Sequence, residues 1–395
     1  VKHDENAIYP CMSCGRPITS GTYCMDCLSR LRDQTRKAAE AMQIRIKEDK
    51  SMSTIERLDK LAEKEFEREN RMSGIKRNFS RGMFKDLSGI IRNMILDLLK
   101  NCRLCPRNCG INRNEKIGFC GAGTKILVAL VSLHKWEEPC LTGKNGAGTI
   151  FFSHCNLKCV YCQNFKISSE NYGKEISNER LTEIFIEQQK RGANNIELVT
   201  PTHYVPQICT ALDAAKSRNL KIPVVYNTNS YENLSTLDLL KNRVDIFLPD
   251  LKYFDEEIAK TFSNAPNYFE VATAAIKKMF ELTGENKFDS AGMMTRGVIV
   301  RHLILPNFRR DSMKILEWLQ KTFGDKIFIS LMNQYTPIFR AGEFKKISRR
   351  LTTFEYDSVV NYAVDIGIKN CYIQVGKTAD AKFIPNFNGE GVKEG

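Results

Sequence analysis

The sequence lacks the features of a membrane-bound or secreted protein. No apolar run in its 395 residues approaches the roughly 18 to 20 residues that a membrane-spanning helix needs. The opening stretch, "VKHDENAIYP", lacks the basic and then apolar layout of a secretion signal. No internal repeat and no low-complexity tract is found. These absences predict a cytoplasmic protein without a membrane segment.

The composition is ordinary for a globular protein, with 42% hydrophobic and 27% charged residues. The length suits one large core with an appendage, or two to three modest domains. A formal net charge of +13 is compatible with nucleic-acid or acidic-protein partners, because a basic surface speeds encounters with any polyanion. Many basic enzymes bind no nucleic acid, so the charge alone does not choose a partner.

Cysteine, in contrast, is abundant, with 14 residues. In a secreted protein this number would suggest disulfides, but most of these cysteines stand in C-x-x-C or similarly close clusters, and no export signal precedes them. Such clusters in a reducing compartment are typical of metal thiolates.

The first cluster lies in "CMSCGRPITSGTYCMDC", which predicts a structural zinc ribbon over residues 1–30. Two C-x-x-C turns can each direct two sulfurs at one ion, and four thiolates close a tetrahedron without an open position for catalysis. The alternative is a chance group of buried thiols. The expected zinc ligands are Cys11, Cys14, Cys24 and Cys27.

Residues 31–100 are predicted to form a basic helical segment, because they are rich in Lys, Arg and Glu and contain no Pro. Ser53 and Glu56 fit a capping box, and a narrow apolar stripe follows them. Such a stripe more often docks on another helix than on a ligand. The surplus of Lys and Arg is the only sign of contact with RNA or protein.

A second cluster follows in "NCRLCPRNCGINRNEKIGFCGAG", within a Cys-rich leader over residues 101–124. Its spacing suits a zinc ion or an auxiliary iron-sulfur cluster and does not separate the two. The small size of the loop beside a larger fold favours zinc. The expected ligands are Cys102, Cys105, Cys109 and Cys120.

Residues 125–395 predict an α/β fold, a partial (β/α)6 barrel of the TIM type. Short apolar runs such as "NIELVT", "IPVVYN" and "VDIFLPD" alternate with amphipathic stretches, as a parallel sheet covered by helices requires. Six such units are present, followed by a late strand, "CYIQVG". Functional residues are expected at the carboxyl ends of the strands.

Three further cysteines, Cys155, Cys159 and Cys162, follow the apolar run in "TIFFSHCNLKCVYCQNF". A [4Fe-4S] cluster normally takes four thiolates, so a loop that supplies three leaves one iron available to another molecule. The alternatives are buried structural thiols, or a zinc ion whose fourth ligand is Cys140, His154 or Cys209.

This spacing, with Tyr161 just before the last cysteine, resembles the hallmark of the radical S-adenosylmethionine (SAM) superfamily. The resemblance implies a radical SAM barrel in which SAM chelates the open iron. It also implies that one electron, from a donor such as flavodoxin or ferredoxin, releases a 5'-deoxyadenosyl radical that abstracts hydrogen from a substrate. The cofactors carry this chemistry and the protein orients and shields them.

Longer stretches, including "CRLCPRNCG", "LVTPTHYVPQI" and "DIFLPDLKYFD", resemble the branch related to pyruvate formate-lyase activating enzyme, over roughly residues 101–390. One departure is His154, where the branch usually has Gly. The imidazole either packs beside the cluster or tunes its potential through a hydrogen bond to sulfur.

The same resemblance implies a set of SAM-binding residues at the strand ends. Thr200 stands where activating enzymes have a Gly-rich turn for the methionine amino group, which leaves that contact to its hydroxyl or carbonyl. Asp250 and Lys252 match an Asp-x-Lys motif for the carboxylate and ribose end. The alternative is an ordinary buried polar network. The remaining candidates are Asn227 and Asn229 for the methionine or ribose part, Arg301 for the carboxylate, and Asn333 near the adenine.

The substrate is not defined by the sequence. Likeness to activating enzymes implies a partner protein as substrate, with hydrogen abstraction from a Gly backbone or another side chain. A second hypothesis is radical modification of tRNA or another RNA, with the basic N-terminal region as the RNA-binding part. A third is a metal scaffold without catalysis, which the three intact loop cysteines disfavour.

Overall fold

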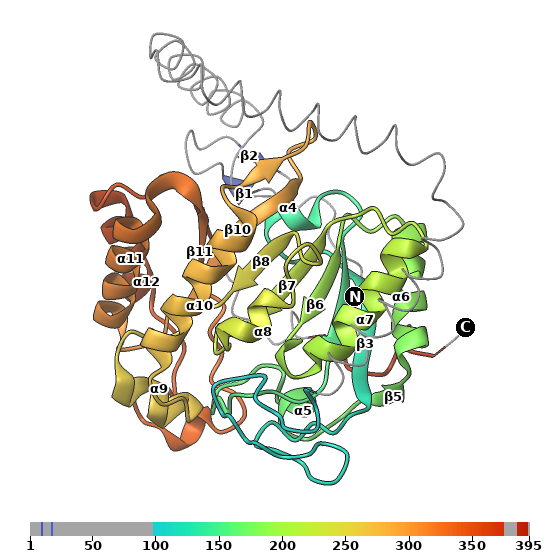
Figure 1. Cartoon of the computed structure of the whole chain (residues 1–395). Helices are drawn as coiled ribbons and strands as arrows, with labels where there is room; N and C mark the ends of the chain where they lie inside the picture. The colour runs from blue at the N-terminus through green and yellow to red at the C-terminus, as the bar shows by residue number, and fades with distance from the viewer. Residues whose placement is uncertain (1–8, 11–16, 19–97, 375–384, 394–395) are drawn as a thin grey trace, which may run out of the picture. The chain divides into compact units, whose positions relative to one another are not determined.

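The computed structural model describes residues 9–10, 17–18, 98–374 and 385–393 (Figure 1). The chain divides into two units, residues 1–94 and 95–395. In the first, β1 (Tyr9–Pro10) pairs antiparallel with β2 (Pro17–Ile18). Nearly all of the expected basic helical segment lies outside the described residues. The same holds for the expected zinc ligands Cys11, Cys14, Cys24 and Cys27.

The second unit contains a curved sheet in the order β5-β3-β4-β6-β7-β8-β10-β11-β12. The strands from β4 to β12 are parallel to one another along this order, whereas β3 and β5 are antiparallel additions at one edge. The predicted α/β partial barrel, with six parallel strands and a late one, is therefore confirmed. The strands are β3 (Ile126–His134), β4 (Ala147–Phe152), β5 (Lys174–Ile176), β6 (Ile196–Val199), β7 (Val224–Thr228), β8 (Ile246–Pro249), β10 (Met294–Leu303), β11 (Phe328–Met332) and β12 (Cys371–Ile373), with β9 (Lys287–Phe288) paired to β10.

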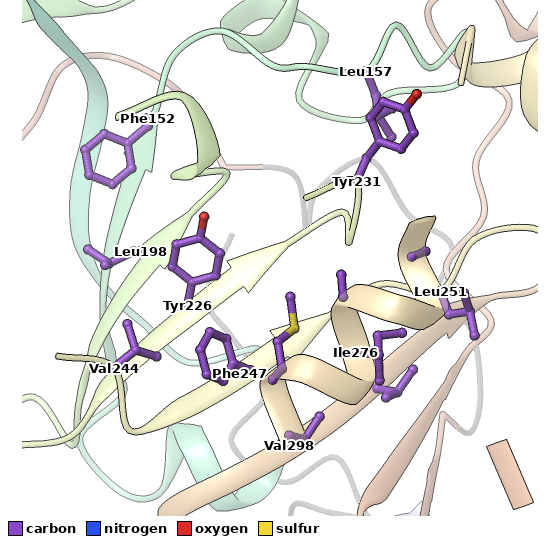
Figure 2. Close-up of a cluster of buried hydrophobic side chains, with 14 of the residues drawn as sticks. Phe152, Leu157, Leu198, Tyr226, Tyr231, Val244, Phe247, Leu251, Ile276 and Val298 are labelled. Atoms are coloured by element: carbon purple, nitrogen blue, oxygen red, sulfur yellow. The ribbon is translucent and has the colours of Figure 1, made fainter. Parts of the chain in front are cut away.

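Helices cover the outer face of this sheet and enclose most of the core (Figure 1). Figure 2 shows part of that core, where Leu198, Tyr226 and Phe247 from neighbouring strands meet Ile276 of a covering helix. The longer helices are α6 (Asn178–Lys190), α7 (Val205–Ser217), α9 (Glu256–Ser263), α10 (Tyr268–Thr283), α11 (Arg309–Phe323) and α12 (Thr353–Asp365), and the short ones are α5 (Phe165–Ser168) and α8 (Leu234–Asp238). No helix in the described residues is long and apolar enough to cross a membrane.

Strand alternation places polar side chains on the inner face of the barrel. Successive side chains of a strand point to opposite faces. Because Leu198 and Tyr226 belong to the helix-covered core, their neighbours Glu197 and Asn227 face inward, and both are buried. The inner face is therefore polar near the carboxyl ends of the strands, where the sequence predicts the site.

A short helix, α4 (Pro139–Thr142), fills the opposite end of the barrel. It lies in the connection between the end of β3 and the start of β4. Cys140 and Leu141 pack there against Val225, Ile246 and Ile299 on the inner face. Figure 1 shows α4 and α5 at opposite ends of the sheet. We call α4 and the inner-face residues that it packs against the α4 floor. This floor closes one end of the barrel, and the three-cysteine loop, which precedes α5, lies at the other end.

Candidate functional site

The loop between β4 and α5 carries Cys155, Cys159 and Cys162 at the carboxyl end of the first parallel strand. His154 begins it with a φ of 75°, and its N–H donates to the carbonyl of Ile167 at 2.7 Å. Glycine adopts a positive φ at no steric cost, whereas other residues do so rarely. The backbone geometry thus explains why Gly is expected at this position.

The His154 ring packs edge-on against His203, with 6.2 Å between centroids. Burial is the main cause that lowers the pKa of this imidazole, which keeps it neutral. Within the described contacts, no hydrogen bond joins the ring to a cysteine sulfur, and its buried Nδ1 has no partner. Of the two roles considered for His154, the geometry favours packing beside the loop.

Each sulfur of the loop faces a polar side chain from elsewhere in the site. Ser263, at the end of α9, donates its hydroxyl to Cys159 Sγ at 2.9 Å. The Asn229 amide donates to Cys155 Sγ at 3.5 Å, and Ser168 Oγ lies 3.2 Å from Cys162 Sγ. Such donors stabilise negative charge on sulfur, so the environment suits thiolates.

As free thiols these cysteines resist ionisation. Burial, and then the neighbouring Cys159, raises the pKa of Cys155 to about 12, and the same two causes raise that of Cys162 to about 11. In the described residues no three His, Cys, Asp or Glu side chains converge closely enough to hold a metal ion as they stand. The thiols would turn toward one another around a cluster, whose positive charge offsets the cost of three buried thiolates. The loop and its donors fit such a cluster.

The side chain of Tyr161, a residue of the loop, takes part in a chain of hydroxyl groups. Its hydroxyl is 2.5 Å from that of Tyr253, which is 2.6 Å from Ser263 Oγ. Its ring meets Tyr335 edge-on, with 5.7 Å between centroids. Tyr161 is therefore connected through the Tyr253 hydroxyl to Ser263, which donates to Cys159.

A charged group lies at the carboxyl ends of β7, β8 and β10. Asp250 accepts from Lys252 Nζ at 2.8 Å and from Arg301 Nε at 2.9 Å, and Arg301 Nη2 donates to Asn227 Oδ1 at 2.6 Å. Burial alone would raise the pKa of Asp250, but the charges of Arg301 and Lys252 outweigh it and hold the pKa below its usual value. Lys252 also interacts electrostatically with Cys159, which places this group beside the loop.

Thr200 belongs to the same region, and Asn333 lies at the end of the neighbouring strand β11, beside Gln334, whose carbonyl accepts from Gln163 of the three-cysteine loop. Thr200 follows β6 with a φ of 58°, and its N–H donates to the carbonyl of Asn227 at 2.9 Å. Asn333 follows β11, and its N–H donates to Gln374 Oε1 at 2.8 Å. The structure thus brings together the expected residues that follow β6, β7, β8 and β10, and it places Asn333 at the carboxyl end of β11, the strand beside β10.

Three glutamates of the inner face were missed by the sequence reasoning, namely Glu138 and Glu197, which are buried, and Glu137, whose side chain is 11% exposed. Glu197 had a usable signal, since in "NIELV" it alternates with two apolar residues and must face away from them. Glu137 and Glu138 precede α4 in a loop, where no periodicity exists to place them. Ser168 and Ser263, whose hydroxyl groups hydrogen-bond to cysteine sulfurs of the loop, also lie outside any motif.

The leader cysteines surround one small cavity. Cys102, Cys105, Cys109 and Cys120 line it with Arg107 and Arg113 among others. Burial is the main cause that raises the pKa of Cys105 to about 12. Arg107 Nε donates to the carbonyl of Asn156 at 3.0 Å, so the leader is fixed directly to the three-cysteine loop.

Comparison with known proteins identifies the class. Residues 149–319 match the family model described as the Radical SAM superfamily. The uncharacterized protein MJ0674 of Methanocaldococcus jannaschii is 31% identical over 297 residues, which cover 71% of this chain and 81% of that protein. MJ0808 of the same organism is 22% identical over 309 residues, covering 73% and 83%. The chain belongs to the radical SAM superfamily.

Among solved structures, SuiB of Streptococcus suis, bound to the precursor peptide SuiA, is 14% identical with a TM-score of 0.41. The match covers 56% of this chain and 46% of the SuiB chain. Membership of the superfamily makes the chain an enzyme of SAM-dependent radical chemistry that binds a [4Fe-4S] cluster and SAM.

Proposed function

We propose that Cys155, Cys159 and Cys162 hold the [4Fe-4S] cluster and leave one iron open for SAM. The observation that carries this assignment is the set of three sulfur-directed side chains, Ser263, Asn229 and Ser168, from three separate segments. When bound, the cluster supplies one electron that cleaves SAM to methionine and a 5'-deoxyadenosyl radical.

The strand-end residues are proposed to hold SAM. Lys252 makes one described ion pair, with Asp250, and an ammonium has three donors, so it can also meet the methionine carboxylate. Arg301 already contacts Asp250, Asn227 and Glu137, which suits it to fix the other polar groups as well as to reach the carboxylate. The other proposed contacts are Thr200 for the amino group, Asn227 and Asn229 for the methionine or ribose part, Asp250 for the ribose, and Tyr161 and Asn333 at the edge of the site.

The test is anaerobic reconstitution with iron and sulfide, reduction, and measurement of 5'-deoxyadenosine after addition of SAM. We expect the wild type to form it and Cys159→Ala to form none. Cys209→Ala is the matched control, because Cys209 is buried in α7 and its thiol donates to the Leu239 carbonyl. Methionine release without deoxyadenosine in the wild type would refute the assignment.

For the substrate we propose a partner protein, in the manner of glycyl-radical activases, with a flavodoxin or ferredoxin as electron donor. The support is the sequence resemblance to activating enzymes over roughly residues 101–390. The test is to incubate the reduced enzyme and SAM with candidate partners and to look for an organic radical by electron paramagnetic resonance.

The alternative substrate is RNA, which the net charge of +13 and the basic composition of residues 31–100 favour. Phosphate contacts release counterions, so RNA binding would weaken steeply as salt rises. Binding of a labelled tRNA between 50 and 200 mM salt, roughly the range over which such contacts lose most of their affinity, separates this alternative from a protein substrate.

Two more metal sites are part of the proposal. The leader cysteines, which share one cavity, would hold zinc or an auxiliary iron-sulfur cluster, and Cys11, Cys14, Cys24 and Cys27 would hold zinc. Metal analysis of a variant with Cys155, Cys159 and Cys162 all changed to Ala decides which metal the leader cysteines hold. Residual iron and sulfide would assign a cluster there, and zinc beyond the one ion proposed for the N-terminal cysteines, without iron, would assign a structural ion. Absence of iron, together with no zinc beyond the N-terminal ion, would refute the leader site.

A further inference from the structure

Three carboxyl groups gather on the inner face of the barrel, and we call Glu137, Glu138 and Glu197 the inner glutamates. Glu197 comes from β6, and the other two come from the segment that leads into α4. Glu137 Oε2 lies 3.3 Å from Arg301 Nη1. Arg301 also interacts electrostatically with Glu138 and Glu197. One guanidinium therefore faces all three.

The carboxyl groups of this region outnumber the cations around them. The inner glutamates and Asp250 supply four carboxyl groups, whereas Arg301 and Lys252 supply two cations, and both cations already contact Asp250. Other polar neighbours are neutral: Asn227 donates to Glu197 Oε1 at 2.6 Å, the Ser330 side chain hydrogen-bonds Glu138, and His134 lies 3.8 Å from Glu137 Oε1 with a pKa that burial lowers.

Among the described residues, two oxygens of the inner glutamates have no hydrogen-bond partner. Glu138 Oε2 and Glu197 Oε2 are buried without a hydrogen bond, and the two residues are 8% and 0% exposed. A buried polar atom without a partner costs about 1–3 kcal/mol, and more if it is charged. Burial accordingly raises the pKa of Glu138 and of Glu197, and like charges add to the rise. A structure retains such a cost where a ligand relieves it.

We propose that the inner glutamates bind a cationic group of the substrate, an ammonium or a guanidinium, within the barrel. Such a group carries both the positive charge and the N–H donors that the two orphaned oxygens lack. This inference rests on the proposed function, because the radical and the substrate meet in the same barrel. It names the chemistry of the substrate group close to Arg301, which can be a free amine or a Lys or Arg side chain of a protein.

The experiment measures binding to the reconstituted, SAM-loaded enzyme by anaerobic calorimetry. The probes are agmatine, the tripeptide Gly-Arg-Gly, and its neutral counterpart Gly-citrulline-Gly. We expect a cationic probe to bind at least tenfold more tightly than the citrulline peptide. Tighter binding of the arginine peptide than of agmatine would indicate a protein side chain, and the reverse order a small amine.

Glu197→Gln and Glu138→Gln remove charge with little change in volume, and each is expected to weaken the cationic probe at least tenfold. Glu281→Gln is the matched control, because this glutamate lies exposed on α10, away from the barrel interior. Equal binding of charged and neutral peptides, no binding of any probe, or displacement of the probe by potassium ions alone would overturn the inference.

The outcome is separable from that of the proposed function. The cluster absorbance and the formation of 5'-deoxyadenosine, measured on the same samples, report on the cluster and on SAM cleavage. If both are normal while the probes show no preference for charge, the inner glutamates have no such role and the radical chemistry stands. If neither a cluster nor deoxyadenosine forms, the proposed function fails first.

Discussion

At the scale of single residues, the site is defined by the side chains that donate hydrogen bonds to the cysteine sulfurs. Cys159 accepts from Ser263, and Ser263 is itself held by Tyr253. Hydrogen bonds to cluster sulfurs stabilise the reduced, more negative state and so raise the reduction potential. The serine therefore contributes to how easily the proposed cluster accepts an electron.

Ser263→Ala is expected to shift the potential of the proposed cluster to more negative values, because one sulfur loses its donor. The measurement is a redox titration followed by electron paramagnetic resonance, on enzyme with a full complement of iron. Ser358→Ala is the control, since its hydroxyl donates to a backbone carbonyl in α12. An unchanged potential in Ser263→Ala would show that this hydrogen bond is absent once the cluster is bound.

The sequence located these residues unequally. The loop cysteines follow from their spacing, and the Asp250–Lys252 pair follows from its resemblance to a family motif, because a motif is local in the chain. Ser263 is 104 positions from Cys159, and only folding brings the two together. The left-handed conformation of Thr200 was likewise hidden, since a β-branched residue rarely adopts a positive φ, whereas the Gly expected at position 154 pointed to the positive φ of His154.

At the scale of elements, the succession of short apolar runs and amphipathic stretches predicts the barrel well. Each parallel strand coincides with a buried apolar run. Because side chains alternate between the two faces of a strand, the sequences of β6 and β7 then define which residues face inward. The α4 segment escaped prediction because it has only one helical turn. Its position depends on packing against residues from three distant strands.

Leu141→Ala is expected to lower the free energy of unfolding by about 2–5 kcal/mol, because Leu141 is fully buried in the α4 floor and its truncation leaves a cavity. Urea denaturation followed by circular dichroism measures the loss. The half-exposed Leu234 of α8 provides the comparison, and Leu234→Ala should change stability little. Equal effects of the two variants would mean that α4 does not fill the barrel end.

The start of α12 predicts a pH-dependent contribution to stability. Arg349 donates to both carboxylate oxygens of Glu355, at 2.7 and 2.8 Å, and Thr352 completes a capping box with it. The Arg349 hydrogen bonds are the main cause that lowers the pKa of Glu355 from 4.5 to about 2. The stabilisation is therefore complete above pH 4.5 and is lost as the pH falls toward 2.

Glu355→Gln is accordingly expected to cost about 1.5–3 kcal/mol at pH 7, the range for hydrogen bonds to a charged group. The difference from wild type should shrink at pH 3.5. Urea denaturation at the two pH values measures both differences. The exposed Glu257 of α9 serves as control, because Glu257→Gln should follow the wild type at both values. A difference that does not change with pH would contradict the lowered pKa.

At the scale of the whole molecule, the chain consists of two units, and every proposed cluster and SAM residue lies in the second, residues 95–395. The large hydrophobic core formed by the described residues also lies within it. The proposed division into a zinc ribbon, a basic helical segment, a leader and a barrel assigns the first two parts to substrate recognition.

A chain that begins at residue 95 is therefore expected to fold, to bind the cluster and to cleave SAM at a rate within about twofold of the full chain, a change that corresponds to under 1 kcal/mol of barrier. It should lose affinity for the macromolecular substrate. Iron content, deoxyadenosine formation and tRNA binding are the measurements. Loss of iron from the shortened chain would show that the N-terminal unit supports the site itself.

The α4 floor sets a limit on the shape of any macromolecule that reacts here. Buried side chains of α4 and three strands fill the barrel behind the inner glutamates, so the route inward is a dead end. A polymer chain cannot pass through the barrel and must instead insert a short protruding part from the open end. A protein would have to insert a chain end or a protruding loop, and an RNA would have to unstack a single nucleotide.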